Sequence, residues 1–217
     1  MPQLSLIQQI CIWVLPLLFA ITFHEAAHAY AAFRCGDTTA KMFGRLSLNP
    51  IRHVDPIGTL LIPLMIGVLT KFTFLFGYAK PVPINWGQLK NPRRDMMLVA
   101  LAGPLANVIM ALFWACCFKI ATMLQLSKPV QFLLLTAQAG IVINLVLFIL
   151  NLIPIPPLDG SRVVSSLLPW KMAQAYSKIE PYGFYILIVL LLTGVIGSML
   201  SPLIDACLQL IKFIFKL

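Results

Sequence analysis

The stretch that decides the fold is the first long apolar run, IQQICIWVLPLLFAITFHEAAHAYAAF at residues 7–33. Glu25 is its only formally charged residue. A helix needs about 20 predominantly apolar residues to cross a hydrocarbon core roughly 30 Å thick. Residues 7–33 are therefore predicted to form a membrane-spanning helix.

The composition of the 217-residue chain also indicates a membrane protein. Apolar residues make up 60% and charged residues 11%, against roughly 25% charged in ordinary soluble domains. These values exclude a soluble globular or a disordered protein, and five cysteines are too few, and odd in number, for a disulfide-stabilised secreted module. The net charge of +9 comes from Lys and Arg scattered between the apolar runs. That pattern is typical of loops that orient a protein in a lipid bilayer, and we expect no nucleic-acid partner.

Further charge-free runs follow the first. Three of them are long enough to span the membrane, at residues 96–118, 129–158 and 181–204. A shorter run at 56–70 would cover only about 22 Å as a helix. It could enter the membrane without crossing it.

The last apolar run, at residues 206–217, contains Lys212 and Lys216. It could be a short final span or an amphipathic segment on the membrane surface. We expect a single integral-membrane domain over residues 1–217. Its predicted fold class is an all-α polytopic membrane protein with about 4–6 transmembrane helices, a re-entrant segment and short extended loop segments.

His24, Glu25 and His28 form the pattern HExxH inside the first predicted helix. Histidines four residues apart in a helix point the same way and can bind one zinc ion, while Glu25, about 100° round the helix, can reach a water on that zinc. The alternative is that these side chains satisfy one another by hydrogen bonds inside a helix bundle. Ionisable residues are costly in a membrane helix, so three of them so close together favour the metal site.

Two histidines do not complete a hydrolytic zinc site, which usually has three protein ligands and a water. The remaining candidates are His53 and the carboxylates Asp37, Asp55, Asp95, Asp159, Glu180 and Asp205. Asp159 stands out because it closes the segment NLIPIPPLDG at 151–160, directly after a full span. Three prolines break the helix there, and irregular backbone at membrane depth is tolerated only where protein or a cavity surrounds it. His53 is the second candidate, with a role in its own loop as the competing explanation.

Several motifs occur in order along the chain. They are HEAAHAY at 24–30, GRLSLNPIRHVDPIGT at 44–59, AKPVPIN at 79–85, AGPLAN at 102–107 and NLIPIPPLDG at 151–160. Together they resemble the site-2 protease family of intramembrane zinc metalloproteases, and the first and last motifs are the specific ones. The resemblance covers most of the chain and is to the compact subgroup with no inserted PDZ module and no appended CBS domain.

The resemblance implies that His24, His28 and Asp159 bind one Zn²⁺ ion and that Glu25 is the catalytic base. It also implies that Asn151 lies near the zinc and contacts the substrate or the developing oxyanion. The implied reaction is hydrolysis of peptide bonds in or near transmembrane segments of membrane proteins, as in regulated intramembrane proteolysis. The expected partners are a membrane-protein substrate with a transmembrane helix and the lipid bilayer.

Two other residues are expected to support the site. Asn107, with Gly103 and Pro104 of the same AGPLAN motif, is predicted to serve close helix packing and an interhelical hydrogen bond near the site. His53 is retained as the second supporting residue.

The topology depends on the run at 56–70. If it crossed fully, Asp159 would emerge on the opposite side of the membrane from His28, and one zinc ion could not bind both. We therefore predict a re-entrant segment near 56–76.

The charges agree with this topology. Only Lys119 and Lys128 then lie on the side opposite the zinc site, among the loops considered. The side of the zinc site carries Arg34, Lys41, Arg45, Arg52, Lys71, Lys80, Lys90, Arg93, Arg94, Arg162, Lys171 and Lys178. By the positive-inside rule, the zinc site is expected toward the cytoplasmic side of a multi-pass protein in a cell membrane, a prokaryotic inner or plasma membrane.

Two other function classes stay open at the level of sequence. A metal-binding membrane transporter would also place His and carboxylates inside the membrane, but it predicts polar residues on several helices, and the run at 181–204 has few. A structural subunit could carry the motif as a vestige. Residues 77–85, with prolines at 81 and 83, could present an extended edge to an unwound substrate strand or form an ordinary connecting loop.

Overall fold

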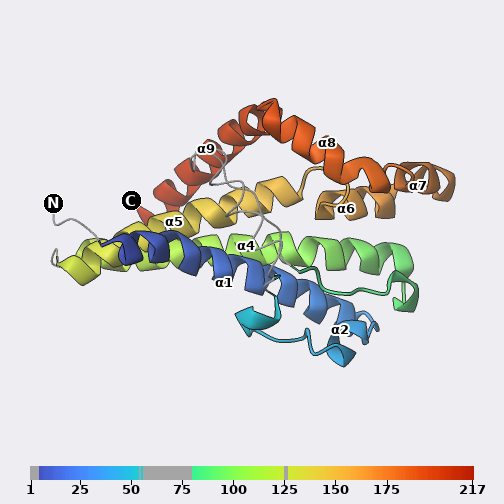
Figure 1. The fold of residues 1–217 in the computed structure, drawn as a ribbon, viewed down its shortest axis with the longest axis horizontal. Coiled ribbons are helices and arrows are strands. Elements are labelled where there is room, and N and C mark those ends of the chain that lie inside the picture. The colour runs from blue at the N-terminus through green and yellow to red at the C-terminus, as the bar shows by residue number, and fades with distance from the viewer. Residues whose placement is uncertain (1–4, 54, 56–79, 125–126) are drawn as a thin grey trace.

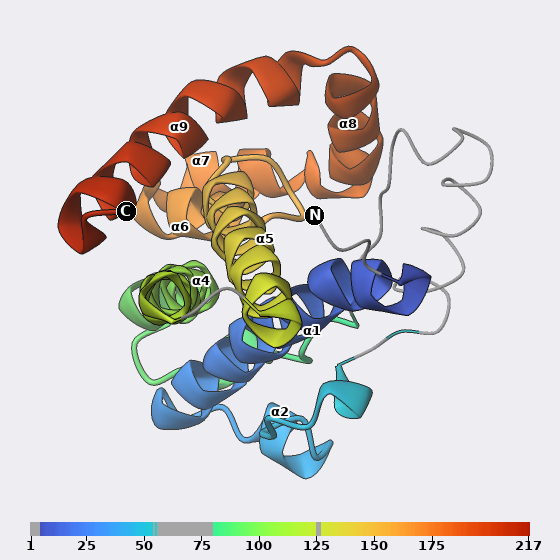
Figure 2. The same ribbon diagram turned by 90° about the vertical axis from the view of Figure 1, so that its left-hand side faces the viewer.

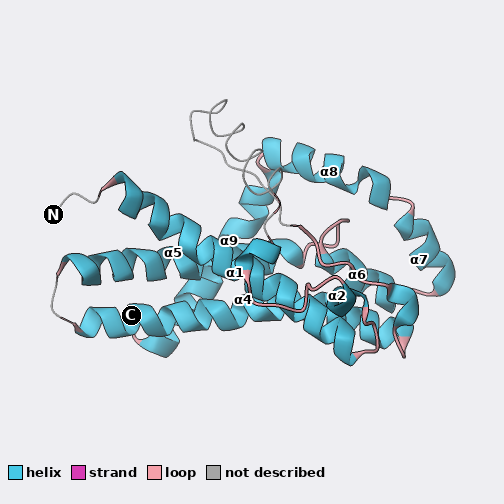
Figure 3. Ribbon diagram, turned by 60° about the horizontal axis from the view of Figure 1, so that its bottom comes forward, coloured by secondary structure: helices cyan, strands magenta, loops and turns pink. Residues whose placement is uncertain are grey.

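The computed structural model describes residues 5–53, 55, 80–124 and 127–217. These residues form helices and loops, with no strand among them (Figure 3), which confirms the predicted all-α fold class. The elements in chain order are α1 (Leu6–Arg34), α2 (Thr39–Met42), η1 (Pro50–Arg52), η3 (Trp86–Gln88), α4 (Pro92–Met123), α5 (Lys128–Asn151), α6 (Asp159–Leu167), α7 (Trp170–Ser177), α8 (Glu180–Leu192) and α9 (Val195–Phe215).

Local sequence fixes the ends of the long helices. α1 begins with a capping box, in which Ser5 and Gln8 each accept a hydrogen bond from the main-chain N–H of the other, so two free donors are satisfied. α4 begins with Pro92 in its first turn, where the missing N–H has no helical partner to lose. α5 ends at Asn151, shortly before three prolines whose rings and missing N–H groups cannot continue a helix.

Four helices are long and apolar enough to cross a membrane, namely α1, α4, α5 and α9. α7 and α8 together form a pair bent by 61°, which would add a fifth span. This number of spans agrees with the prediction and makes the chain a multi-pass membrane protein. The start of α1 and the end of α9 lie at the same end of the molecule (Figure 1).

The prediction of one continuous span over residues 181–204 is wrong. The chain breaks between α8 and α9, where Gly194 has a φ of 76°. Glycine adopts this left-handed conformation without the steric cost that other residues meet, which explains why the break occurs there. Residues 206–217 are mostly the second half of α9 and not a separate element.

α1, α4 and α5 pack against one another, and α9 lies against the outside of α5 (Figure 2). One end of this bundle is held by an apolar cluster that includes Trp114 of α4, Ile141 of α5 and Ile211 of α9. On α1 the fully buried positions toward its partners include Ala20, which is 0% exposed. Small residues let membrane helices approach closely, so the polar residues of α1 come within reach of α4 and α5.

The predicted re-entrant segment near 56–76 lies outside the described residues. The chain on either side of it is described, and the N–H of Lys80 donates to the carbonyl oxygen of His53 at 3.1 Å. The chain therefore re-enters the described part beside the point where it left.

Candidate metal centre and active site

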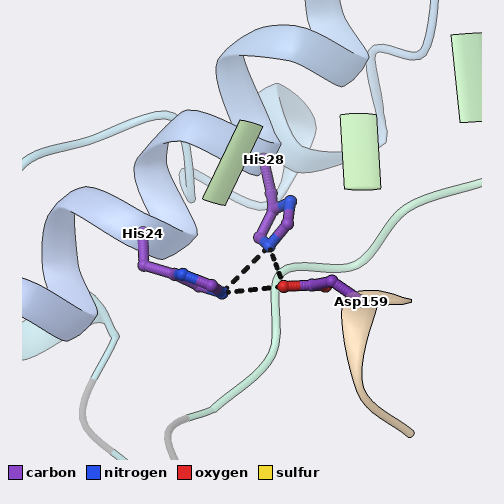
Figure 4. Close-up of side chains that lie close together, drawn as sticks. All are labelled: His24, His28 and Asp159. Atoms are coloured by element: carbon purple, nitrogen blue, oxygen red, sulfur yellow. Dashed lines mark hydrogen bonds and ion pairs between the residues drawn. The ribbon is translucent and has the colours of Figure 1, made fainter. Parts of the chain in front are cut away.

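Two histidines of α1 and the first residue of α6 point their side chains at one spot (Figure 4). Nε2 of His24 and Nε2 of His28 are 3.1 Å apart. Oδ2 of Asp159 lies 3.2 Å from each of them. In the part of the chain that the structure describes, this is the one group of His, Cys, Asp and Glu side chains that could hold a metal ion.

The hydrogen bonds of the other ring nitrogens decide where the imidazole protons lie. Nδ1 of His24 is 2.6 Å from Oδ1 of Asn107, and Nδ1 of His28 is 2.7 Å from the carbonyl oxygen of Val99. Both oxygens can only accept, so in the neutral imidazoles each Nδ1 carries the hydrogen and each Nε2 presents a lone pair.

Oδ2 of Asp159 is buried and accepts no hydrogen bond from the described residues. Lone pairs of two imidazoles and a carboxylate thus face one another in a buried place. A metal ion bound between them would make this arrangement favourable, because buried polar atoms without partners are costly.

The spacing of the three atoms fits zinc. Zinc binds His nitrogen and carboxylate oxygen at about 2.0–2.2 Å in tetrahedral geometry, which separates neighbouring ligand atoms by about 3.3 Å. The separations of 3.1 Å and 3.2 Å are close to that value. Three such side chains around a zinc ion would leave one position for water, which is the composition of a catalytic zinc site.

Gly103 of α4 forms one wall of this centre. A Cβ atom at this position would lie 2.3 Å from Nε2 of His28 and 2.7 Å from Nε2 of His24. The main chain of α4 therefore approaches both imidazoles so closely that no side chain fits between them. Sequence reasoning assigned Gly103 to helix packing, and the structure adds direct contact with the centre.

Asp159 reaches the centre because the chain turns sharply after α5 and starts α6 at this residue. Burial alone would raise the pKa of Asp159, but when the imidazoles of His24 and His28 are protonated, their hydrogen bonds and charge outweigh burial and lower this pKa to about 2. The carboxyl group is therefore ionised at neutral pH, the form that a metal ligand requires.

His24, His28 and Asp159 line a cavity of about 790 Å³. Glu25 lines this cavity beside the two histidines, and one of its carboxylate oxygens, Oε2, accepts a hydrogen bond of 2.9 Å from the N–H of Val82. The walls are mostly apolar and come from α1, α5, α8 and the segment around Val82. They include Ile21, Leu147, Phe184 and Leu187.

Asn151 and His53 lie in different surroundings. Asn151 lines the same cavity, and its side-chain N–H donates to the carbonyl oxygen of Leu147 at 3.0 Å. His53 is fully buried in the loop after α2, where its Nε2 is 2.7 Å from the carbonyl oxygen of Ser47. The structure therefore brings Asn151 to the cavity and leaves His53 out of the group that could hold a metal ion.

Asn144 of α5 is a polar residue of the site that sequence reasoning missed. It is 0% exposed and accepts a hydrogen bond of 3.0 Å from the side chain of Asn107. An amide in the middle of an otherwise apolar run was the signal that could have found it, because membrane helices rarely carry one without a partner.

Comparison with known protein families shows which family the chain belongs to. The pattern of Peptidase family M50 matches residues 12–133 and 119–194. The chain belongs to this family. M50 peptidases are the site-2 protease family, so the resemblance seen in the sequence is confirmed.

Named relatives agree with the M50 assignment. The chain is 40% identical over 214 residues to the Bacillus subtilis protein "Putative zinc metalloprotease YwhC", covering 94% of this chain and 92% of that one. It is 29% identical over 192 residues to "Putative zinc metalloprotease Rip2" of Mycolicibacterium smegmatis, covering 86% of this chain and 69% of that one. No solved structure matches the chain. This M50 member is thus a zinc metallopeptidase embedded in the membrane, and the transporter alternative loses its support.

Proposed function

We propose that this M50 peptidase cleaves membrane proteins in or beside their transmembrane helices, with His24, His28 and Asp159 as the zinc ligands and Glu25 as the catalytic base. The observation that carries the proposal is the triangle of three lone-pair atoms, 3.1–3.2 Å apart, beside a carboxylate in one cavity. A zinc ion held there would lower the pKa of its water toward about 7 and polarise the scissile carbonyl.

Glu25 is the residue that we propose as the general base. It follows His24 directly in α1, so its carboxylate faces the cavity beside the metal ligands. In the proposed reaction it accepts a proton from the attacking water and later delivers that proton to the leaving amine. The N–H of Val82 holds one oxygen of the carboxylate and leaves the other for the water.

The position of the histidines along α1 and the apolar walls of the cavity favour a membrane-embedded substrate. His24 and His28 lie within the candidate span Ile10–Arg34, and the cavity walls of α1, α5 and α8 are mainly apolar. A peptide bond in a transmembrane helix is hidden in an intrahelical hydrogen bond, so the substrate must unwind locally before attack. Residues 80–85 lie along this cavity without helical structure, and we propose that they pair with the unwound strand.

Asn151 is proposed to bind the substrate or the developing oxyanion. It stands in the last turn of α5 and lines the cavity with Asp159. Its amide is a hydrogen-bond donor of the kind that stabilises negative charge on a carbonyl oxygen during acyl transfer.

We further propose that the centre faces the cytoplasm. The helix ends near it carry Arg34, Arg93 and Arg94, whereas Lys119 and Lys128 lie at the far ends of α4 and α5. The positive-inside rule then puts the metal centre on the cytoplasmic side of a multi-pass prokaryotic plasma-membrane protein.

Glu25→Gln tests the reaction and can identify the substrate. The variant keeps the size of the side chain and the metal ligands but cannot take a proton, so zinc content should stay at the wild-type level while proteolysis disappears. Membrane-protein fragments are compared in cells that carry the wild type, Glu25→Gln, or Asp205→Asn as a control on the exposed face of α9. Fragments present with the wild type and the control, and absent with Glu25→Gln, would name the substrate. Cleavage retained by Glu25→Gln would refute the role of this residue.

A further inference from the structure

A chain of hydrogen bonds between side chains leads from the metal centre into the interior of the helix bundle. It starts at Nδ1 of His24 on α1, continues through the amide of Asn107 on α4, and ends at the amide of Asn144 on α5. Both asparagines are 0% exposed. Two amides in an apolar bundle are costly unless each donor and acceptor is paired, so the direction of each amide is set by its hydrogen-bond partners.

The two histidines differ in what fixes them. His28 faces the carbonyl oxygen of Val99, a main-chain group that cannot turn round. His24 faces the side-chain amide of Asn107, which could present either its oxygen or its NH₂ group. If the NH₂ group faced Nδ1, that nitrogen would have to accept, and the hydrogen of the neutral ring would move to Nε2. Nε2 would then point a hydrogen at the place where the metal ion belongs.

Two acceptors hold the NH₂ group of Asn107 away from His24. One is the carbonyl oxygen of Ala20 at 3.3 Å, which lies one helical turn before His24 and is also the usual acceptor for the main-chain N–H of His24. The other is Oδ1 of Asn144 at 3.0 Å. Asn144 supplies the shorter of the two hydrogen bonds.

The direction of Asn144 is itself fixed. Its Nδ2 donates to the carbonyl oxygen of Gly140 at 2.8 Å, on the same helix. That carbonyl can only accept, so the NH₂ group of Asn144 must face it, and Oδ1 must face Asn107. Main-chain carbonyls of α1 and α5 therefore determine the direction of both amides.

We propose that Asn144 is a positioning residue for the metal centre: by orienting the amide of Asn107, it keeps the hydrogen of His24 on Nδ1 and the lone pair of Nε2 directed at the metal ion. The proposal rests on the proposed role of His24 as a ligand. It adds a third helix to the support of the centre, since α5 acts on α1 through α4.

The test measures zinc binding by the full-length chain, purified in detergent, freed of metal and titrated with Zn²⁺ against a competing chelator. Asn144→Leu keeps the approximate volume and removes both hydrogen bonds. We expect its zinc dissociation constant to rise about tenfold or more, as is typical when a group that orients a metal ligand is lost. The visible spectrum of the Co²⁺-loaded chain, which reports ligand geometry, should change as well.

Thr136→Val is the matched control, because Thr136 is also buried in α5 and donates to a carbonyl four residues earlier, that of Phe132, at 2.7 Å. Both variants should lower the unfolding temperature of the metal-free chain by similar amounts, and the control should bind zinc as the wild type does. A zinc affinity of Asn144→Leu within twofold of the wild type would overturn the proposal.

A double-variant cycle separates positioning from packing. If Asn144 acts through Asn107, then Asn107→Leu and the double variant Asn107→Leu, Asn144→Leu should have the same zinc affinity. If the loss of zinc affinity in the double variant equals the product of the losses in the two single variants, the proposal is overturned, because Asn144 then acts independently of Asn107. His24→Ala tests the proposed ligand role of His24 separately from the proposed role of Asn144. Unchanged zinc affinity in His24→Ala would show that His24 is not a zinc ligand.

Asn144→Asp keeps the test decisive if Asn144→Leu does not fold. Whether its carboxyl group is ionised or protonated, it still offers an acceptor to Asn107, so the amide keeps its direction. Zinc affinity within threefold of the wild type is expected. A loss of tenfold or more in a folded Asn144→Asp chain would contradict the proposal.

Discussion

Gly103→Ala adds one methyl group at the wall of the metal centre. The new Cβ would lie 2.3 Å from Nε2 of His28, whereas Cβ contacts under 3.0 Å are essentially never found. The ring must therefore retreat by at least 3.0 − 2.3 = 0.7 Å. Metal–ligand distances tolerate only about 0.2 Å, so the displaced nitrogen no longer serves as a ligand.

The expected loss of zinc affinity follows from the binding free energy that one ligand contributes. Four-ligand zinc sites bind with about 10–16 kcal/mol, so one ligand contributes on the order of 3 kcal/mol, or about 100-fold in the dissociation constant. Zinc affinity, measured by chelator competition on the detergent-solubilised chain, should fall at least that far in Gly103→Ala. Peptide hydrolysis should fall with it.

Gly197→Ala in α9 is the control, because nothing lies within 4 Å of the added Cβ there. Both substitutions replace glycine inside a helix, where alanine is favoured by about 1 kcal/mol. Loss of helix stability therefore cannot explain a defect seen in Gly103→Ala alone. Wild-type zinc affinity and hydrolysis in Gly103→Ala would show that α4 leaves room for a Cβ atom beside the two histidines.

Two further predictions concern the metal and the substrate. A strong chelator should abolish hydrolysis, and added Zn²⁺ should restore it. Zn²⁺ at 100 times its dissociation constant should also raise the free energy of unfolding of the wild type by about 2.7 kcal/mol. Thermal unfolding of His28→Ala should show no such stabilisation. Asn151→Ala should bind zinc normally but lose about 10²-fold to 10³-fold in kcat, as expected for removal of an oxyanion donor; a kcat within threefold of the wild type in a steady-state cleavage assay would argue against that role.

Helical periodicity and the cost of charge in a membrane account for what the sequence could predict. Four residues make one helical turn, so His24 and His28 had to share a face of α1 wherever that helix packed. Asp159 could be singled out because prolines are strong local signals and acidic residues are few. These inferences needed no knowledge of long-range contacts, and the structure brings the three side chains together.

The parts that sequence could not predict depend on which helix faces which. The contact of Gly103 with both imidazoles and the pairing of Asn107 with Asn144 join residues far apart in the chain. The break at Gly194, by contrast, is local in cause but ambiguous in sequence, because a single glycine is tolerated inside many helices. Hydropathy alone therefore predicts one span where the structure has the two helices α8 and α9.

The proposed metal ligands and the proposed base Glu25 are held by different kinds of structure. The two histidines are oriented from α4, through a main-chain carbonyl and an amide, inside a bundle whose helices pack closely. Glu25 instead takes its hydrogen bond from Val82, in the non-helical segment that also lines the cavity. The same segment is tied to the end of α1 by the carboxylate of Asp37, which accepts from the N–H of Asn85 at 2.8 Å. A substrate strand that paired with this segment would therefore act on the direction of Glu25 while the ligand geometry stayed fixed by α4.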